Sequence, residues 1–333
     1  MSLELARRIA DTVLYQDGML APNRPLALGN RQPKSVGILY PPSCPEVVSG
    51  TERGTMHSEC LVQAAQSATL QIHLRFLQLM RRQFARRQGH QSTPVPSLLV
   101  EGQLFESMDE PIEQSIDSPV FTLPGRQEYR FHIAGGAHAE PMLDHKGQLA
   151  GGVTRTHSEL NGTISVATEI LRPGVLKLVI DVANTSQLAG RSLDLDTALF
   201  SSLLSAHAIV ELHGAEFVSL LNPPPEFEEL TDTCSNRGSF PVLIGIPPAR
   251  KMMLCSPVTL RDYPEIASEG VSDISAEMDE TLTRRVLSMA SDEKRRVANA
   301  GDRLRDLLDH TEYRANDQLS RTHGRVRRMR PAS

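Results

Sequence analysis

The sequence contains no tryptophan, and its aromatic content is only 4%. Proteins that bind single-stranded nucleic acid stack the bases on exposed aromatic side chains, so we expect no such platform here. The formal net charge of −5 provides no general attraction for phosphate groups. The composition therefore argues against nucleic-acid binding by the body of the chain.

Long apolar runs are also missing. No stretch approaches the roughly 18 consecutive apolar residues that a membrane-spanning helix needs. Residues 1–16 carry charges along their length and show no small-residue cleavage site, so they do not resemble a secretion signal. The sequence predicts no membrane span, and a cytoplasmic location is the expectation.

The four cysteines are widely separated, and no two form the CxxC pair that is typical of zinc and iron–sulfur sites. We expect four reduced, mostly buried thiols and no cofactor, while a mixed Cys/His site assembled from distant segments is the alternative. These residues are Cys44, Cys60, Cys234 and Cys255. The stretch MHSEC places His57 and Glu59 beside Cys60, but one local pair gives little support for a Cys/His nucleophile. No catalytic residue is predicted.

Four histidines occur within residues 131–163: His132, His138, His145 and His157. No HxH, HxxxH or HExxH pair is present, so local geometry does not hold any two of them at ligand distance. We interpret these histidines as surface or loop residues and predict no metal. A metal site remains the alternative interpretation.

Changes in composition divide the chain into five parts. Proline and acidic residues punctuate residues 89–125, which indicates a linker and a domain boundary. The predicted parts are an N-terminal α/β segment (1–88), this linker (89–125), an antiparallel β core (126–274), a helical arm (275–315) and a basic flexible tail (316–333). Within the first part, the patterns predict an amphipathic helix (3–15), strands (35–42 and 70–79) and a helix (80–88).

The β core is predicted from turn chemistry and alternation. Asn161-Gly162 is the preferred two-residue type I′ turn, so residues 152–160 and 163–171 are expected to form a hairpin. A three-residue loop ending in a left-handed Gly174 then brings the apolar face of residues 175–184 against Ile164 and Val166.

The rest of the core is predicted less uniquely. Residues 199–214 fit either a helix or a long strand, residues 222–234 a proline break and short helix, and residues 240–245 and 252–264 strands. The predicted fold class is α+β, with a meander or sandwich-like antiparallel sheet, an N-terminal α/β segment and a C-terminal helical arm.

Three polar residues form the candidate site. The predicted hairpin register places Arg155, His157 and Glu159 on its apolar side, where buried polar groups must pair or line a cavity. The structural alternative is that this end of the strand emerges into solvent. The functional alternative is a polar pocket in which His157 titrates near neutral pH and Arg155 binds an anion.

Several segments resemble a family of uncharacterised bacterial proteins. They are ARRIADTVLY (6–15), VGILYP (36–41), MHSECLVQ (56–63), GAEFVSLLNPP (214–224) and MLCSPVTLRDYPEIASEGVSDISAEMDETLTRRVLSM (253–289). This family is associated with gene clusters of uptake [NiFe]-hydrogenases, so the resemblance implies an accessory or maturation role. The chain departs from the family pattern after ADTVLY, and the resemblance implies no catalytic residues.

These observations lead to three functional hypotheses. The first is a non-catalytic accessory protein that binds protein partners, with hydrogenase subunits or maturation factors as candidates. The second is an enzyme or small-ligand binder with a pocket at Arg155, His157 and Glu159. The third is an acidic or RNA partner bound by the arginine-rich tail, although solvated tail residues are the simpler interpretation.

Overall fold

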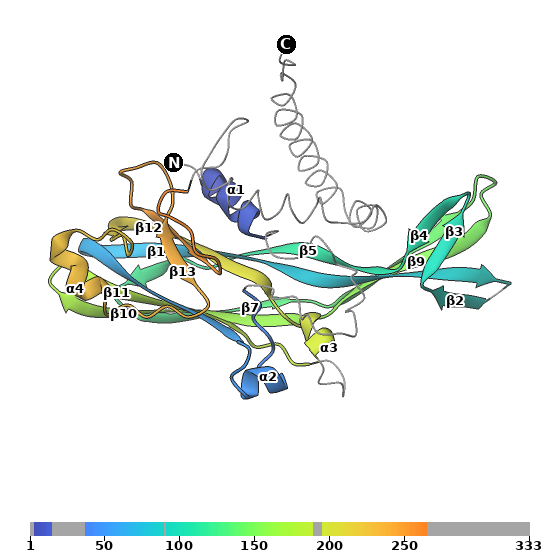
Figure 1. The fold of residues 1–333 in the computed structure, drawn as a ribbon, viewed down its shortest axis with the longest axis horizontal. Helices are drawn as coiled ribbons and strands as arrows, with labels where there is room; N and C mark the ends of the chain where they lie inside the picture. Colours follow the sequence, from blue (N-terminus) through green and yellow to red (C-terminus); the bar gives the residue numbers. More distant parts are fainter. Residues whose placement is uncertain (1–2, 15–36, 90, 189–194, 265–333) are drawn as a thin grey trace, which may run out of the picture. The chain divides into compact units, whose positions relative to one another are not determined.

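The computed structural model describes residues 3–14, 37–89, 91–188 and 195–264. All of its paired strands are antiparallel, and twelve of them belong to one sheet (Figure 1). The strands are β1 (Thr55–Gln88), β2 (Gln91–Val95), β3 (Ser97–Val100), β4 (Gln103–Glu106), β5 (Met108–Asp117), β6 (Phe121–Leu123), β7 (Arg126–Ile133), β8 (Gly136–Leu143), β9 (Leu149–His157), β10 (Leu160–Arg172), β11 (Val175–Asn184), β12 (Leu204–Phe217), β13 (Phe240–Leu243) and β14 (Met252–Ser256). The helices are α1 (Leu3–Leu14), α2 (Pro45–Val48), α3 (Leu195–Leu199), the 3-10 helix η1 (Pro225–Phe227) and α4 (Glu228–Thr231).

The 34-residue strand β1 organises the sheet by changing partners along its length. Residues 55–63 pair with β11, and residues 62–77 pair with β12. Further along, β6, β5 and β2 pair with β1, and β9 pairs with residues 80–86. A register shift between Ala64 and Thr69 marks the point where β1 passes from one set of partners to the next.

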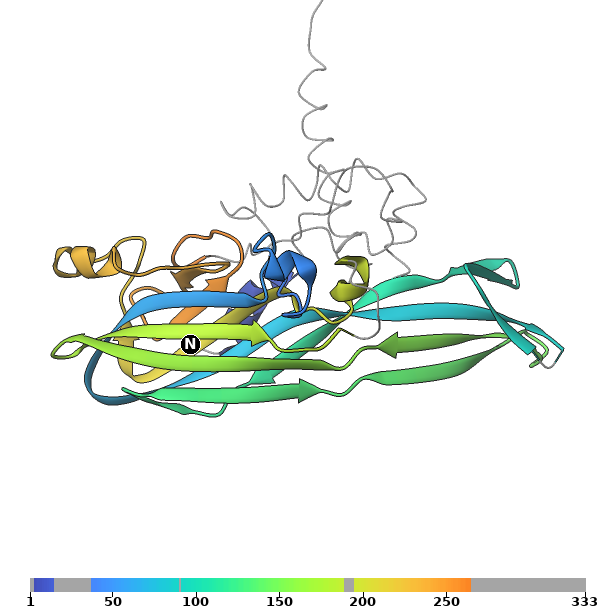
Figure 2. The same ribbon diagram turned by 90° about the horizontal axis from the view of Figure 1, so that it is seen from below.

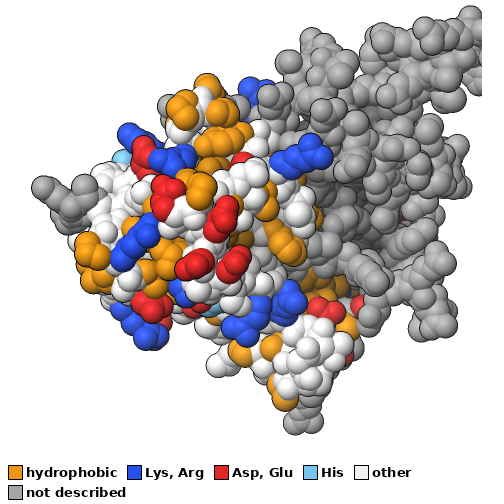
Figure 3. All heavy atoms as spheres, turned by 60° about the vertical axis from the view of Figure 1, so that its left-hand side comes forward, with side chains coloured by type: hydrophobic (Ala, Val, Ile, Leu, Met, Phe, Trp, Pro, Cys, Tyr) orange, Lys and Arg blue, Asp and Glu red, His pale blue; other side chains and the backbone are white. Residues whose placement is uncertain are grey.

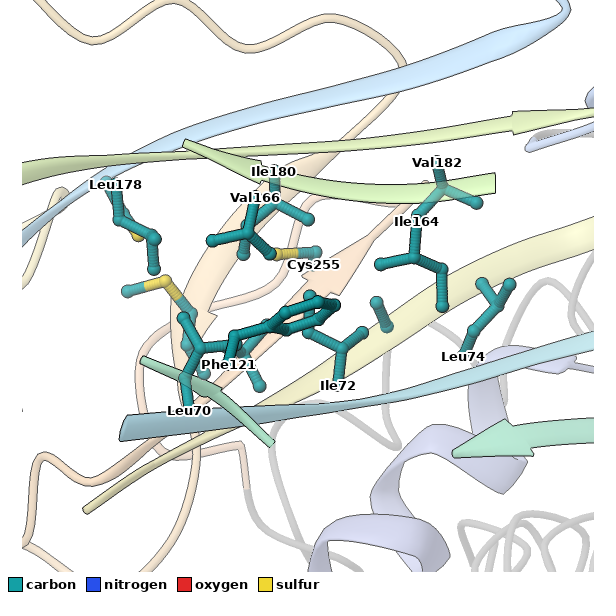
Figure 4. Close-up of a cluster of buried hydrophobic side chains, with 14 of the residues drawn as sticks. Leu70, Ile72, Leu74, Phe121, Ile164, Val166, Leu178, Ile180, Val182 and Cys255 are labelled. Carbon is teal, nitrogen blue, oxygen red and sulfur yellow. The ribbon is translucent and has the colours of Figure 1, made fainter. Parts of the chain in front are cut away.

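This change of partners folds the sheet over itself, as Figure 2 shows. One layer contains the first part of β1 with β11, β10 and β7, and the other contains residues 69–77 of β1 with β6, β12, β14 and β13. The core fills the space between the layers (Figure 4). Leu70 and Ile72 meet Val166 and Ile180 there, and all four are at most 1% exposed. The expected antiparallel β core is therefore confirmed, but it is one curled sheet that also includes β1, β2, β5 and β6, which lie outside the predicted bounds of 126–274.

The β10–β11 pairing follows the predicted register. Ile164 lies opposite Val182 and Val166 opposite Ile180, and all four side chains are buried. Gly174 has the left-handed φ of 76° that the turn requires. The alternation of apolar residues predicts this pairing correctly. The predicted three-residue loop is wrong, because Arg172 pairs with Val175 across a two-residue turn and a register shift lies between Ile170 and Arg172.

The prediction of a hairpin turn at Asn161-Gly162 is wrong. Both residues lie inside β10, where they pair with His132 and Phe131 of β7, while β9 pairs with β1 and β8. A Cβ atom on Gly162 would lie 2.2 Å from Cζ of Phe131. This glycine therefore makes room for an aromatic ring of the core rather than forming a turn.

The helix predicted for residues 80–88 is also wrong, because β1 continues through them. Its arginines favoured a helix by composition, but cross-strand partners decide the structure. Arg81 pairs with Asp109 on β5, at 3.4 Å between Nε and Oδ1, and Arg82 forms an ion pair with Glu110 on the same strand. Tertiary pairing overrides the local helix preference.

The segment predicted to be a linker, residues 89–125, forms strands β2 to β6. Pro94 lies in β2 and Pro111 in β5, and each of these strands pairs only with β1. Proline is tolerated in a strand that has one free edge, because its missing N–H group then breaks no ladder bond. The prolines therefore mark edge strands rather than a break in the fold.

The remaining predictions have mixed outcomes. The helix at 3–15 and the short helix after the proline break at 222–234 are confirmed, and residues 204–217 adopt the strand alternative. The strand predicted at 35–42 is reduced, in its described part, to one bridge between Leu39 and Leu203. The predicted arm (275–315) and tail (316–333) lie outside the described residues.

Candidate functional site

The predicted site lies in a part of the sheet that we call the extension: residues 80–88 of β1 with β2, β3, β4, β8 and β9 (Figure 1). Here β9 lies between β1 and β8. A small apolar cluster of Phe84, Leu98 and Val153 holds the β3–β4 hairpin against this sheet. Its rings of Phe84 and Phe105 are 5.6 Å apart between centroids.

Arg155 belongs to a chain of ion pairs that crosses the extension. In this chain, Glu110 and Glu140 lie between the basic side chains of Arg82, Arg155 and His138. Arg82 on β1 is the direct cross-strand neighbour of Arg155, and His138 on β8 flanks it on the other side. Glu110 forms an ion pair with Arg82 and lies 3.8 Å from Nε of Arg155, measured to Oε2. Glu140 accepts a hydrogen bond from Nη1 of Arg155 at 3.1 Å. Two carboxylates therefore already compensate the charge of Arg155.

Burial dominates the electrostatics at the inner end of this chain of ion pairs. Desolvation raises the pKa of Glu110 and lowers the pKa of Arg82, although the opposite charge of each partner acts against its shift. At the outer end, the hydrogen bond from Arg155 lowers the pKa of the exposed Glu140. Desolvation thus determines the direction of the pKa shift at the buried pair, and attraction to the partner charge determines it at the exposed pair.

His157 is the second predicted site residue, and it lies two positions from Arg155 on the same strand face. Its ring packs over Gly136, where an added Cβ atom would lie 2.9 Å from Nε2. Its buried Nδ1 atom has no hydrogen-bond partner among the described residues. A buried polar atom in this state is a candidate ligand contact.

Glu159 does not join the other two residues. It lies after the end of β9, its side chain is 60% exposed, and it accepts a hydrogen bond of 2.8 Å from Nδ2 of Asn161. The structure therefore brings together Arg155 and His157, with Glu110 and Glu140 added, but leaves Glu159 outside this group. The hairpin register that united the three residues was wrong.

Two pairs of exposed leucines are the feature that the sequence analysis missed. Leu99 and Leu104 lie directly opposite each other in the β3–β4 hairpin, with 62% and 52% of their surface exposed. Leu143 and Leu149 form a second such pair where β8 meets β9, with 57% and 42% exposed. We call these four residues the leucine pairs. An ion pair of Glu101 and His145 joins the turns of the two hairpins.

A sequence signal for the first pair was present. The stretch SLLV places three large apolar residues in a row in one strand and QLFE places two in the next, so both faces of the β3–β4 hairpin are apolar. Leu98 and Phe105 use one face for the small cluster, and Leu99 and Leu104 occupy the other. A hairpin that is apolar on both faces has one face left for a partner.

The MHSEC segment does not form a nucleophile pair. His57 binds Asp181, with 2.6 Å between Nδ1 and Oδ1, and its Nε2 lies 3.4 Å from Oε1 of Glu59. Cys60 is 1% exposed within the core, and burial raises the pKa of its thiol. An inaccessible thiol with a raised pKa is a poor nucleophile.

The other histidines and cysteines are also placed by their surroundings. His132 pairs with Asn161, His138 with Glu140 and His145 with Glu101. Cys44, Cys60 and Cys255 are buried, as predicted, and Cys234 is partly exposed.

Within the described ranges, no group of three or more His, Cys, Asp or Glu side chains is arranged to hold a metal ion. None of the helices that the structure describes is long and apolar enough to cross a bilayer.

Comparison with known proteins adds no family. The sequence matches no protein-family model and no curated protein. The resemblance to proteins of hydrogenase gene clusters therefore stays a prediction.

Proposed function

We propose that this chain is a non-catalytic binding protein that joins a partner protein through the leucine pairs of the extension. The observation that carries this proposal is the direct cross-strand pairing of exposed leucines in two hairpins, whose turns are joined by Glu101 and His145. Burying such side chains against another apolar surface is the main favourable term in protein association.

The proposed partner presents an apolar surface to the two hairpins. The small cluster beneath the β3–β4 hairpin fixes its position, so the exposed pair is offered on a preformed surface and little ordering is needed on binding. The sequence resemblance makes hydrogenase subunits and their maturation factors the first partners to test.

The experiment is a mild affinity purification from the native host with three versions of the chain. The wild-type protein is compared with a Leu99→Ser/Leu104→Ser variant and with a Val48→Ser control. Val48 is 76% exposed on α2, so the control removes an apolar side chain elsewhere that is more exposed than either leucine.

We expect the partner to be recovered with the wild-type protein and the control, and to be lost with the double variant. Thermal unfolding should show that all three proteins are folded, because the substituted side chains are exposed. Recovery of the same partner with the double variant would refute the proposal. A concentration-dependent dimer that the double variant abolishes would assign the leucine pairs to self-association instead.

Ligand binding beside His157 is a second candidate function. It is favoured by the buried Nδ1 atom of His157, which has no partner among the described residues. It is disfavoured by Arg155, which Glu110 and Glu140 already engage. Unchanged function in the host after Arg155→Ala and His157→Ala substitutions would eliminate this candidate.

A further inference from the structure

A pocket of about 740 Å³ lies at the end of the sheet that carries the β10–β11 turn. Figure 3 views this end, where basic, acidic and hydrophobic side chains lie close together on the surface. Four segments meet here: the middle of β1, the β10–β11 turn, the end of β12 and η1. A volume of several hundred cubic ångströms is typical of sites for small ligands.

An irregularity in β12 opens one wall of this pocket. Leu212 donates a backbone hydrogen bond of 2.8 Å to the carbonyl of Lys251, and Phe217 donates one of 2.7 Å to the carbonyl of Arg250. The four residues between these donors therefore span only one step of the neighbouring segment, and Gly214 among them has a φ of 77°. Bulges of this kind redirect side chains and are common beside functional sites.

The exposed Arg172, another residue of the lining, lies against an aromatic ring. The guanidinium carbon of Arg172 lies 4.7 Å from the centroid of the Phe227 ring. Phe227 is 2% exposed and is anchored in a cluster with Leu61, Val175 and Val218. A guanidinium stacked on a buried ring keeps its N–H groups available for a ligand at a small cost in conformational entropy.

The charges that line the pocket are only partly compensated. Glu216 binds Arg250, with 2.8 Å between Oε2 and Nη2. In the part of the chain that the structure describes, Arg172, Lys251 and Glu226 form no ion pair, although all three line the pocket. Two cationic side chains and one carboxylate, all three exposed, thus belong to the lining of one pocket without a charged partner among the described residues.

We propose that this pocket binds a short peptide with free termini. Arg172 and Lys251 hold its carboxylate, because guanidinium and ammonium groups make charge-assisted hydrogen bonds to carboxylates. Glu226 holds its ammonium group, which a simple anion lacks. This site lies away from the leucine pairs, and the inference does not depend on the proposed function.

The test is isothermal titration calorimetry of the full chain with trialanine as the probe. Two blocked probes, trialanine amide and N-acetyl-trialanine, remove one terminal charge each. We expect trialanine to bind, and amidation to weaken binding by about ten- to a hundredfold, since a hydrogen bond to a charged group is lost. Acetylation should weaken binding in the wild-type protein and have little further effect in a Glu226→Gln variant.

Arg172→Gln and Lys251→Gln should each reproduce the effect of amidation. Lys251 is exposed, so its variant retains the fold even if loss of the Arg172–Phe227 contact disturbs the pocket wall. The matched control is Arg261→Gln, which removes an exposed arginine outside the pocket and should leave binding unchanged. Equal binding of trialanine and its amide, no binding of trialanine, or full competition by inorganic phosphate would each overturn the proposal.

Discussion

Replacing Gly162 with alanine tests the central pairing of the sheet. Gly162 lies in β10 opposite Phe131 of β7, and an added Cβ atom would lie 2.2 Å from Cζ of that ring. The ring is 4% exposed and packs against Phe76, with 6.2 Å between the ring centroids. The ring is thus buried among core side chains, and we expect it to move only by displacing them.

The size of the effect follows from this geometry. Carbon atoms in contact normally lie about 3.5–4.0 Å apart, so the ring must move by about 1 Å or more. Overpacking of this kind costs about 1–3 kcal/mol, and an alanine in a strand regains about 0.5–1 kcal/mol relative to glycine. We expect the free energy of unfolding to fall by about 1–2 kcal/mol.

The assay is denaturant unfolding of a double-mutant cycle that adds Phe131→Leu. Leucine lacks the ring atoms that the new methyl group meets, so Gly162→Ala should cost at least about 1 kcal/mol less in the Phe131→Leu background. If Gly162 were a turn residue, the substitution with alanine would lower the free energy of unfolding through backbone strain alone. The cost would then be the same whatever residue occupies position 131. An equal cost of Gly162→Ala in both backgrounds would refute the packing argument.

Three further predictions concern the extension and the thiols. The Leu99→Ser/Leu104→Ser variant should bind the partner at least about tenfold more weakly, because each half-exposed leucine contributes about 1 kcal/mol when the partner buries it fully. Calorimetry with the purified partner measures this change. Unchanged affinity would place the interface elsewhere. An NMR titration should show the pKa of Glu140 below its ordinary range and a return to that range in Arg155→Gln. Stabilisation by this carboxylate should therefore be complete above the ordinary carboxyl pKa and be lost as the pH falls through the lowered one; an unshifted Glu140 would contradict the 3.1 Å contact. At pH 8, a thiol reagent should label Cys234 of the native protein slowly, because the pKa of this thiol is raised to about 11. The buried Cys44, Cys60 and Cys255 should be labelled only after unfolding. Rapid labelling of Cys60 would show that the core opens.

The sequence predicts the β10–β11 pair because several local signals agree there. The alternation of residues 164–182 and the left-handed Gly174 indicate one register, and the structure has that register. The helix at residues 3–14 is predicted for the same reason, since its apolar spacing repeats over several turns.

The failures occur where distant partners decide the structure. Residues 80–88 are helical by composition, but β5 and β9 lie on either side and impose a strand. Asn161-Gly162 has the chemistry of a turn, but Phe131 uses the missing side chain of Gly162 for packing. β5, β9 and Phe131 are all distant in sequence, so local patterns do not identify them, although residues 84–88 also pair with the adjacent strand β2.

The candidate site follows the same rule. Alternation places Arg155 and His157 correctly on one face of a strand, but it cannot supply Glu110 and Glu140, which belong to other strands. The sequence groups Glu159 with them only if one strand continues through residues 158 and 159, but β9 ends at His157 and β10 begins at Leu160.

The length of β1 also fixes the order in which the chain can complete its sheet during synthesis. Residues 62–77 of β1 pair with β12, so one edge of this strand has no hydrogen-bond partner until residues 204–217 have been synthesised. The β10–β11 pair, by contrast, closes through a short turn and can form as soon as residue 184 is available. An apolar strand with an unpaired edge is a template for wrong association. We therefore expect the nascent chain to depend on chaperones most strongly between the synthesis of β1 and that of β12.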